Sequence, residues 1–202
     1  MATVNTVEID DVIPKLYQDQ IEAELASDRM AWFFRLEPGR TVSLLGKSGA
    51  DASYSGFTNT VFHVDNVGAP ASTVTALLLP LLFTFCEKTK TPFNRLLRIR
   101  LGLYPRIALD AAHHPHVDFY YPHNNAVYYV NDADGDTVLF NETSEQVPQA
   151  LLPEYTRADR FTIAKRITPK KGRMVGFEGK QYHASMHPMQ ASHRIAIAFG
   201  WL

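Results

Sequence analysis

The C-terminal segment HRIAIAFGWL, His193–Leu202, carries the pattern that decides the fold. Large apolar residues alternate in it with one arginine and two alanines, in the order Arg194, Ile195, Ala196, Ile197, Ala198, Phe199. Because side chains at positions i and i+2 of a β-strand point to the same face, the segment is predicted to be a strand with one large apolar face. Arg194 shares the other face with the alanines, and a guanidinium in a largely buried strand needs an anion as its partner.

Similar segments precede this strand from Pro92 onward. They are rich in Val, Ile, Tyr and Phe, are separated by turn signals, and read LLRIRLGLY, HVDFYY, NAVYYVN, DTVLFN, DRFTIAKRI, RMVGFEG and QYHAS. Asp134-Gly135, within NDADGDT, predicts a hairpin turn between two of them. A closed barrel or a double-sheet jelly roll would remove most exposed edges of so many strands. Residues 93–202 are therefore predicted to form such a core.

Residues 1–92 are predicted to be helical support and loops. Apolar residues recur every four positions in Asp10–Ala26, and Thr73–Lys88 has a wide apolar stripe, so each is predicted to be a helix. The Gly- and Ser-rich segment Glu37–Gly56 is expected to be a loop, over the mouth of a site. The aromatic residues 32–34 are expected to end the first helix and pack in the core. The fold class is thus α+β, mainly β.

The composition indicates a single globular domain over residues 1–202. The chain is 46% hydrophobic and 20% charged, with a net charge of −1, which argues against nucleic acid as a partner. Cys86 is the single cysteine, so no internal disulfide can form, and we expect a cytoplasmic setting. The longest apolar run, Ala76–Cys86, is well short of the roughly 20 residues that cross a bilayer, so no membrane association is expected.

The stretch HHPHVDFYYPH, His113–His123, holds four of the eight histidines of the chain. In the predicted strand HVDFYY, His116 and Asp118 share a face and could act as neighbouring metal ligands. His183, in the later predicted strand QYHAS, is the candidate for a third ligand. Two histidines and one carboxylate with open positions form the facial triad of non-haem Fe(II) oxygenases, although this donor set also suits zinc.

The other histidines are interpreted as bystanders. His113 and His114 are expected in a solvated loop, and His123 and His187 in turns. His63 begins a rival His-x-Asp motif with Asp65, but it lacks a tyrosine strand at the right distance downstream. The basic run KRITPKKGR is interpreted as a solvated hairpin tip.

Taken in their order along Leu96–Leu202, six segments resemble the 2-oxoglutarate- and Fe(II)-dependent dioxygenases of the prolyl 4-hydroxylase type. They are LGLYPRI, HVDF, AVYYVND, GDTVLFNE, GRMVGFEGKQYHAS and HRIAIAFGWL. The resemblance implies a double-stranded β-helix (jelly-roll) core with N-terminal support helices. It implies hydroxylation of an unactivated C–H bond of a peptidyl or amino-acid substrate, with Fe(II), 2-oxoglutarate and dioxygen. It leaves ascorbate open as a further cofactor.

The same resemblance implies roles for individual residues. His116, Asp118 and His183 would bind the iron. Arg194 would bind the distal carboxylate of 2-oxoglutarate, where many members of the family have lysine. Tyr129, the second tyrosine of VYYVN, would bind the same carboxylate, and Tyr104 matches a tyrosine near the metal-binding end of the co-substrate.

Three alternatives stay open. The same chemistry could act on a small metabolite or an alkylated nucleobase, because the first 90 residues match the family only loosely. The triad could belong to a zinc hydrolase, but Arg194 and Tyr129 would then have no co-substrate to bind. The barrel could also be a non-catalytic metal-binding module, against which the complete set of ligands and anchors argues.

Overall fold

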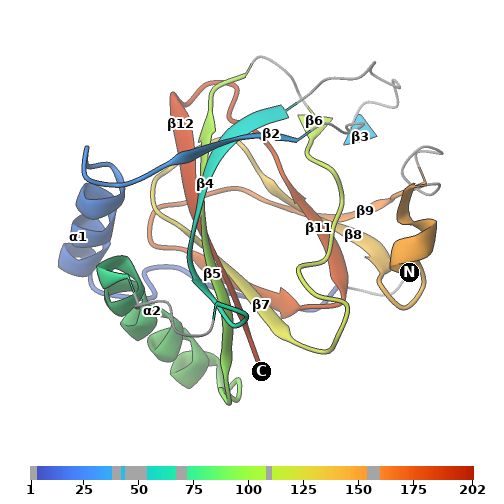
Figure 1. Ribbon diagram of the computed structural model, residues 1–202, viewed down its shortest axis with the longest axis horizontal. Coiled ribbons are helices and arrows are strands. Elements are labelled where there is room, and N and C mark those ends of the chain that lie inside the picture. The colour runs from blue at the N-terminus through green and yellow to red at the C-terminus, as the bar shows by residue number, and fades with distance from the viewer. Residues whose placement is uncertain (1–3, 38–41, 44–53, 67–71, 108–110, 154–159) are drawn as a thin grey trace.

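Two antiparallel sheets face each other in the structure, a computed structural model, and two helices lie against the outside of the larger sheet (Figure 1). The structure describes residues 4–37, 42–43, 54–66, 72–107, 111–153 and 160–202. The arrangement is a jelly-roll core, mainly β, with helices from the N-terminal half of the chain. The predicted fold class is therefore confirmed.

The larger sheet has seven strands and includes the predicted C-terminal strand near its middle. In spatial order it contains β1 (Thr6–Ile9), β10 (Met174–Glu178), β7 (Asn124–Tyr129), β12 (His193–Trp201), β5 (Leu96–Pro105), β4 (Tyr54–His63) and β2 (Phe33–Glu37). Both neighbours of β12 run antiparallel to it. The alternation in β12 decides what each face does: Ile195, Ile197 and Phe199 pack in the core beneath the helices, while Arg194 faces the interior of the jelly roll.

The smaller sheet covers the other side of the interior. It contains β11 (Gln181–Ser185), β8 (Thr137–Thr143) and β9 (Ile163–Ile167), and a separate short pair joins β3 (Val42–Ser43) to β6 (Ala111–Ala112). A short 3-10 helix, η1 (Gln149–Leu151), follows β8. Apolar side chains fill part of the space between the two large faces, namely Val127, Leu139, Ile167, Val175 and Phe177. The rest of that space is a polar cavity.

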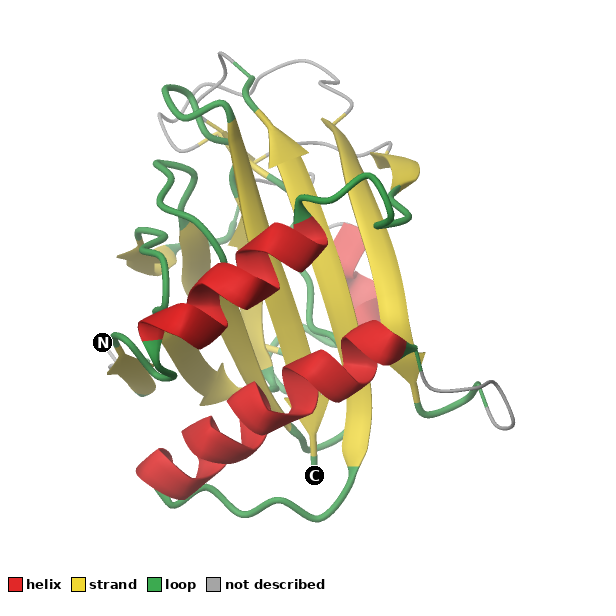
Figure 2. Ribbon diagram, turned by 90° about the vertical axis from the view of Figure 1, so that its left-hand side faces the viewer, coloured by secondary structure: helices red, strands yellow, loops and turns green. Residues whose placement is uncertain are grey.

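The two helices cross the outer face of the larger sheet (Figure 2). In α1 (Lys15–Leu25) the buried Ile21 and Leu25 continue the periodicity that predicted the helix. In α2 (Thr73–Thr89) the side chain of Ser72 accepts a hydrogen bond from the Val74 N–H, as an N-cap does. Their apolar stripes meet the apolar face of the sheet in one core, so each helix is held by burial rather than by propensity alone.

The N-terminal half contributes more than the predicted helices and loops. Four strands, β1 to β4, come from it, and three of them extend the larger sheet at its two ends. The expected loop Glu37–Gly56 is wrong at both ends, because β2 ends at Glu37 and β4 begins at Tyr54; most of the loop lies outside the described residues. β4 pairs with both β2 and β5, which lie almost entirely outside this segment, and this explains why the local Gly- and Ser-rich composition did not reveal the strand.

The aromatic residues 32–34 do not end the first helix, which stops at Leu25. Phe33 and Phe34 belong to the edge strand β2, and each is 60% exposed, so their predicted core packing is wrong. Trp32 does pack against the core, and its indole N–H donates to the Leu25 carbonyl oxygen. Alternation on a strand at the sheet edge leaves large side chains in solvent on both faces.

Two further predictions of local structure are wrong. HVDFYY is not a regular strand: only His116 pairs with another strand residue, in an isolated bridge to His183. Asp134-Gly135 does not close a hairpin, because β7 and β8 lie in different sheets. The Asp134 carboxylate instead accepts hydrogen bonds from the backbone N–H groups of Met189, Gln190 and Ala191, which ties this crossing loop to the turn before β12.

Candidate metal centre and anion pocket

His116 and His183 lie directly opposite each other on neighbouring backbone segments. The N–H of each donates to the carbonyl oxygen of the other at 3.0 Å, which is the hydrogen-bonded pair of an antiparallel ladder. Their side chains therefore leave the backbone on the same side, and the ring centroids lie 4.5 Å apart. The pairing of two distant segments, rather than the predicted strand, brings these imidazoles together.

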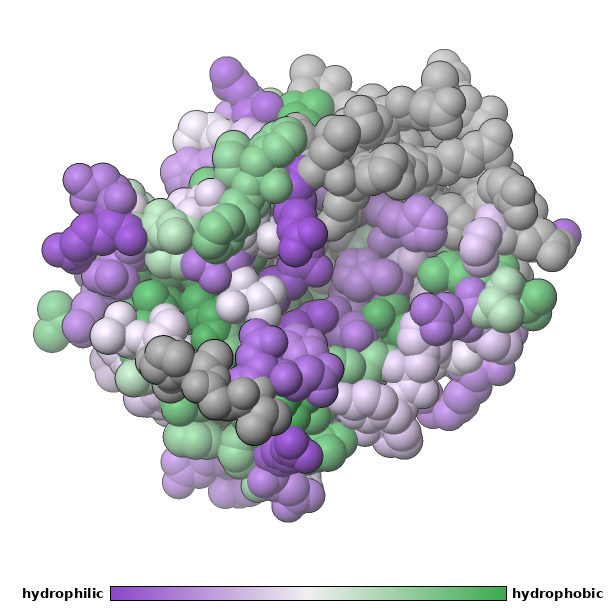
Figure 3. Space-filling view, viewed as in Figure 1, coloured by the Kyte–Doolittle hydropathy of each residue, from purple (hydrophilic) through white to green (hydrophobic). Residues whose placement is uncertain are grey.

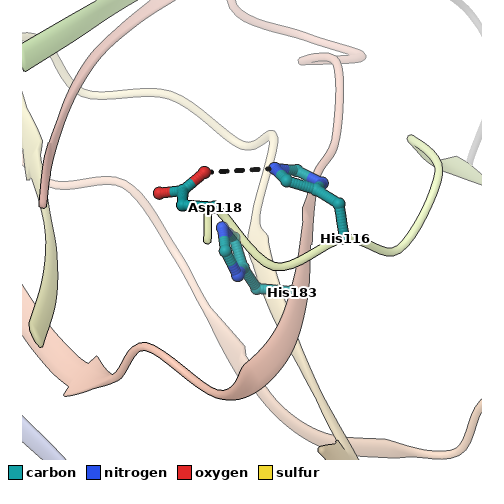
Figure 4. A group of neighbouring side chains, drawn as sticks. All are labelled: His116, Asp118 and His183. Atoms are coloured by element: carbon teal, nitrogen blue, oxygen red, sulfur yellow. Dashed lines mark ion pairs between the residues drawn. The ribbon is translucent and has the colours of Figure 1, made fainter. Parts of the chain in front are cut away.

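Asp118 completes a group of three possible ligands (Figure 4). One donor atom from each of His116, Asp118 and His183 lies within 4.8 Å of the others. The Asp118 Oδ1 atom is 3.8 Å from His116 Nε2. Among the residues that the structure describes, no other group of histidine, cysteine and acidic side chains meets this spacing. His63 and Asp65 pair with each other at 3.6 Å and take no part in the triad.

Backbone hydrogen bonds orient both imidazoles with the same nitrogen inward. The Nδ1–H of His116 donates to the His114 carbonyl oxygen at 3.0 Å, and that of His183 donates to the Gln181 carbonyl oxygen at 3.1 Å. A carbonyl can only accept, so each Nδ1 carries the proton and each Nε2 keeps a lone pair. A hydrogen bond of this kind fixes the tautomer of a metal-binding histidine.

The protonation states also suit a metal. Burial and, to a smaller extent, the neighbouring His183 lower the pKa of His116 to about 4; burial likewise lowers the pKa of His183. Burial raises the pKa of Asp118, but His183 and Arg98 offset this, and the pKa ends well below its ordinary value. Near neutral pH the site therefore offers two neutral imidazoles and one carboxylate, a donor set that fits a divalent ion such as Fe(II).

Arg98 supports the carboxylate from the neighbouring wall. It extends from β5, and its Nη2 donates to Asp118 Oδ1, while its guanidinium lies over the Phe119 ring at 5.3 Å from the centroid. The Asp118 side chain is only 5% exposed, so this charged hydrogen bond matters more than one in solvent. Arg98 was not predicted as a site residue, although it alternates with the candidate Tyr104 along β5.

Arg194 is fully buried on the opposite side of the same cavity. Its Nη2 donates to Thr137 Oγ1 at 2.8 Å, and its Nη1 lies 3.5 Å from the Met186 carbonyl oxygen. Nε has no hydrogen-bond partner, and within the described parts of the chain no carboxylate forms an ion pair with this guanidinium. A buried cation in this state fits an anionic ligand with a planar carboxylate.

The two candidate tyrosines contact the guanidinium of Arg194. The Tyr129 hydroxyl donates to Thr137 Oγ1 at 2.8 Å, so Tyr129 and Arg194 both donate to one threonine, which was not predicted as a site residue. The centroids of the Tyr104 and Tyr129 rings lie 5.1 and 5.5 Å from Arg194 Cζ. Tyr104 thus lies at the arginine end of the cavity, and its ring also packs over Gly102, where a Cβ atom would be 2.8 Å from the hydroxyl oxygen.

A cavity of about 280 Å³ connects the triad with Arg194. Hydrophilic side chains gather around the hollow in the middle of the face in Figure 3. The cavity is lined by the triad residues, by Arg98, Arg100, Gly102 and Tyr104 from β5, by Thr137 from β8, and by Arg194, Ala196 and Ala198 from β12. The small residues leave room between the metal ligands and the arginine.

Two of the remaining histidines, His113 and His187, are buried. His113 is buried and not solvated: its ring stacks on His187 with centroids 4.9 Å apart, beside Tyr104. His187 follows β11 as expected, but it is buried, and its Nδ1–H donates to the Pro105 carbonyl oxygen at 2.7 Å. In the basic run, Lys170 is exposed and Lys171 is partly buried, and they form surface ion pairs with Asp10 and Asp19 of the N-terminal part.

No family model matches the sequence, and no curated protein matches it. Solved structures do. The non-haem α-ketoglutarate-dependent epimerase SnoN from nogalamycin biosynthesis superposes with a TM-score of 0.66 at 11% identity, covering 99% of this chain and 79% of that one. HygX from Streptomyces hygroscopicus, with nickel and 2-oxoglutarate bound, gives 0.63 at 16% identity, covering 98% and 83%.

A prolyl-4-hydroxylase from Pseudomonas putida superposes with a TM-score of 0.53 at 15% identity, covering 98% of this chain and 92% of that one. Within the described residues, no helix has the length and apolar character needed to cross a membrane. One of these neighbours is an epimerase and another is a prolyl-4-hydroxylase, so proteins with this fold perform different reactions. The fold of this chain is the fold of the 2-oxoglutarate- and Fe(II)-dependent oxygenases.

Proposed function

We propose that the protein is a 2-oxoglutarate-dependent non-haem iron dioxygenase that hydroxylates an unactivated C–H bond. The observation that carries the proposal is that one cavity contains both a candidate metal site and a candidate site for a carboxylate. Three candidate metal ligands with suitable tautomers lie at one end, and a buried arginine that pairs with no carboxylate of the described residues lies at the other. A fold shared with oxygenases of this class supports the same reading.

The metal ligands would be His116, Asp118 and His183. The neutral Nε2 atoms and the ionised carboxylate bind a divalent ion without first losing a proton. Arg98 donates to Asp118 Oδ1, the same oxygen that lies near His116, and limits the rotation of the carboxylate. When bound, iron and 2-oxoglutarate would supply the electrons that activate dioxygen, which is the oxidant of the C–H bond.

Arg194 would bind the distal carboxylate of 2-oxoglutarate through its planar fork of N–H donors. Thr137 and Tyr129 fix the position of the guanidinium, and the Tyr104 ring closes the cavity beside it. Gly102, Ala196 and Ala198 keep the path to the metal free of large side chains. The apolar cluster between the sheets excludes water from the adjacent space, which protects an oxidising site.

The substrate would be a peptidyl or amino-acid substrate, as for a prolyl 4-hydroxylase, or a small metabolite. The epimerase SnoN shares the fold with the prolyl-4-hydroxylase, so the fold does not select among these. A zinc hydrolase would use the triad but would leave Arg194 buried without a ligand. The same proposal treats residues 1–202 as one functional unit, because strands from the N-terminal half extend the sheet that carries Arg194.

The test is a succinate-release assay with Fe(II) and 2-oxoglutarate, with and without ascorbate. Peptides containing proline, free amino acids and nucleosides would each be added in turn. We expect slow succinate release without substrate and faster release with one class. A protein that binds metal but neither binds nor consumes 2-oxoglutarate would contradict the proposal, and a zinc-dependent hydrolysis without 2-oxoglutarate would replace it.

A further inference from the structure

Asn125 is a buried polar residue of β7 to which the proposed function gives no role. Its side chain belongs to a residue that is 2% exposed, and neither the amide oxygen nor the amide nitrogen has a hydrogen-bond partner among the described residues. A buried amide in this state destabilises a fold, because it loses its hydrogen bonds with water and gains none in return. A partner that becomes available when a ligand binds would explain its presence.

The register of three strands places Asn125 close to Arg98. In the ladder of β5 and β12, Arg98 pairs with Gly200, and on the other side of β12 Gly200 pairs with Asn125. Asn125 alternates with Val127, and Gly200 with Ala198, so both belong to the face of the sheet that lines the cavity. Because Gly200 has no side chain, no side chain of β12 separates the amide from the guanidinium.

The space above Gly200 shows in which direction the amide points. A Cβ atom on Gly200 would lie 3.6 Å from Asn125 Oδ1 and 3.2 Å from the edge of the Phe119 ring. The Arg98 guanidinium lies over the same ring, 5.3 Å from its centroid. The amide oxygen of Asn125 therefore leans over Gly200 toward the strand that carries Arg98, and the ring of the residue after Asp118 lies beside both groups.

Arg98 and a metal ion would compete for one oxygen atom. Arg98 Nη2 donates to Asp118 Oδ1, and the same oxygen lies 3.8 Å from His116 Nε2, where the candidate metal ligands face one another. A divalent ion and a guanidinium at one oxygen repel each other strongly in a buried site, where the effective dielectric constant is low. The Arg98 side chain is only 14% exposed, so a displaced guanidinium needs another acceptor.

We infer that Asn125 is a positioning residue of the metal site, and that its Oδ1 atom accepts a hydrogen bond from Arg98 when a divalent ion binds to Asp118. The inference rests on the proposed function, because it assigns the ion to the triad. Before the ion binds, Arg98 neutralises and holds the buried carboxylate. Afterwards the ion neutralises the carboxylate, and Asn125 keeps the guanidinium hydrogen-bonded. The unpartnered amide thus belongs to the metal-free protein alone.

The experiment measures two properties of each variant: Mn(II) affinity by electron paramagnetic resonance, and the melting temperature of the metal-free protein. Asn125→Leu keeps the number and branching of the heavy atoms but removes the polar ones. It should weaken Mn(II) binding about 10-fold, as the loss of a group that positions a metal ligand does. It should also raise the melting temperature by at least about 2 °C, because it removes a buried amide without a partner. Asn125→Thr keeps an acceptor and should retain part of the Mn(II) affinity.

Tyr128→Phe is the matched control. Tyr128 also lies in β7, and its buried hydroxyl has no partner among the described residues, but it packs in the core beneath the helices. The control should raise the melting temperature in the same way and leave Mn(II) affinity unchanged. The role of Arg98 is tested in an Arg98→Met protein, in which Asn125→Leu should no longer change the Mn(II) affinity.

Wild-type Mn(II) affinity in Asn125→Leu would overturn the inference, as would an equal loss in Tyr128→Phe or a loss that persists in full in the Arg98→Met protein. A lower melting temperature of metal-free Asn125→Leu would overturn it too, since the amide would then stabilise the fold. All these outcomes leave the proposed function standing, whereas a wild-type protein that binds no Mn(II) would refute the metal site itself.

Discussion

Replacing Arg194 with methionine should weaken the binding of 2-oxoglutarate by roughly 10²–10⁴-fold. The fully buried guanidinium would donate two charge-assisted hydrogen bonds to the distal carboxylate, each contributing about 1.5–3 kcal/mol. Two such bonds amount to about 3–6 kcal/mol, and each 1.4 kcal/mol changes the dissociation constant tenfold. Methionine fills much of the same volume among Tyr104 and Tyr129, so the loss should come from the ligand and not from a cavity.

The assay is calorimetric titration of 2-oxoglutarate into the Mn(II)-loaded protein without oxygen. Tyr129→Phe should act in the same direction by about 2- to 10-fold, because it removes one neutral hydrogen bond, to Thr137, that positions the arginine. Mn(II) affinity should stay unchanged in both variants, since neither residue is a ligand. Arg29→Met provides a surface control.

Equal 2-oxoglutarate affinity in wild type and Arg194→Met would refute the reasoning, as would a loss of metal binding of the same size. The first result would mean that the buried guanidinium serves the fold and not a ligand. The second would mean that the variant disturbs the triad, and that the cavity does not separate the two ends as the ladder of β5 and β12 indicates.

Three further predictions concern the metal, the acid stability and a glycine. Asp118→Asn should weaken Mn(II) binding at least about 100-fold, since it removes the one anionic ligand and leaves Arg98 without its carboxylate partner. Electron paramagnetic resonance measures this affinity, and Asp65→Asn in the rival motif should leave it unchanged. Burial and the charges of His113 and Arg194 lower the pKa of His187 to about 4, below the 6.5 of an unfolded histidine. The stability that the neutral imidazole contributes is therefore present above pH 6.5 and is lost as the pH falls toward 4. In urea titrations, the unfolding free energy of His187→Gln should fall less steeply with decreasing pH than that of the wild type, and an unchanged slope would contradict this. Gly135→Ala should cost about 1–3 kcal/mol in thermal unfolding, because its Cβ would lie 2.7 Å from the Met186 carbonyl oxygen and from backbone atoms of His187 and Pro188; an unchanged melting temperature would show that the crossing loop can shift.

Much of this protein follows from local patterns in its sequence. The alternation in His193–Leu202 correctly predicted a strand with Arg194 facing away from the apolar core, because strand geometry alone decides which face a side chain takes. The same holds for the helices, whose apolar stripes needed only a surface to cover. His116, Asp118 and His183 were selected by residue type and order, since few side chains can bind a metal.

Only the tertiary structure decided how these side chains meet. His116 and Asp118 do not share the face of a regular strand, contrary to the prediction, and the contact with His183 depends on a single bridge between segments more than sixty residues apart. Arg98, Thr137 and Arg100 enter the site because strands of two sheets face one cavity, and nothing near them in the sequence specifies which strands pair. Strand pairing depends on the apolar surface that the whole fold buries, and it therefore determines which groups lie beside a charged side chain. The sequence alone indicates only that a buried charged side chain needs a partner.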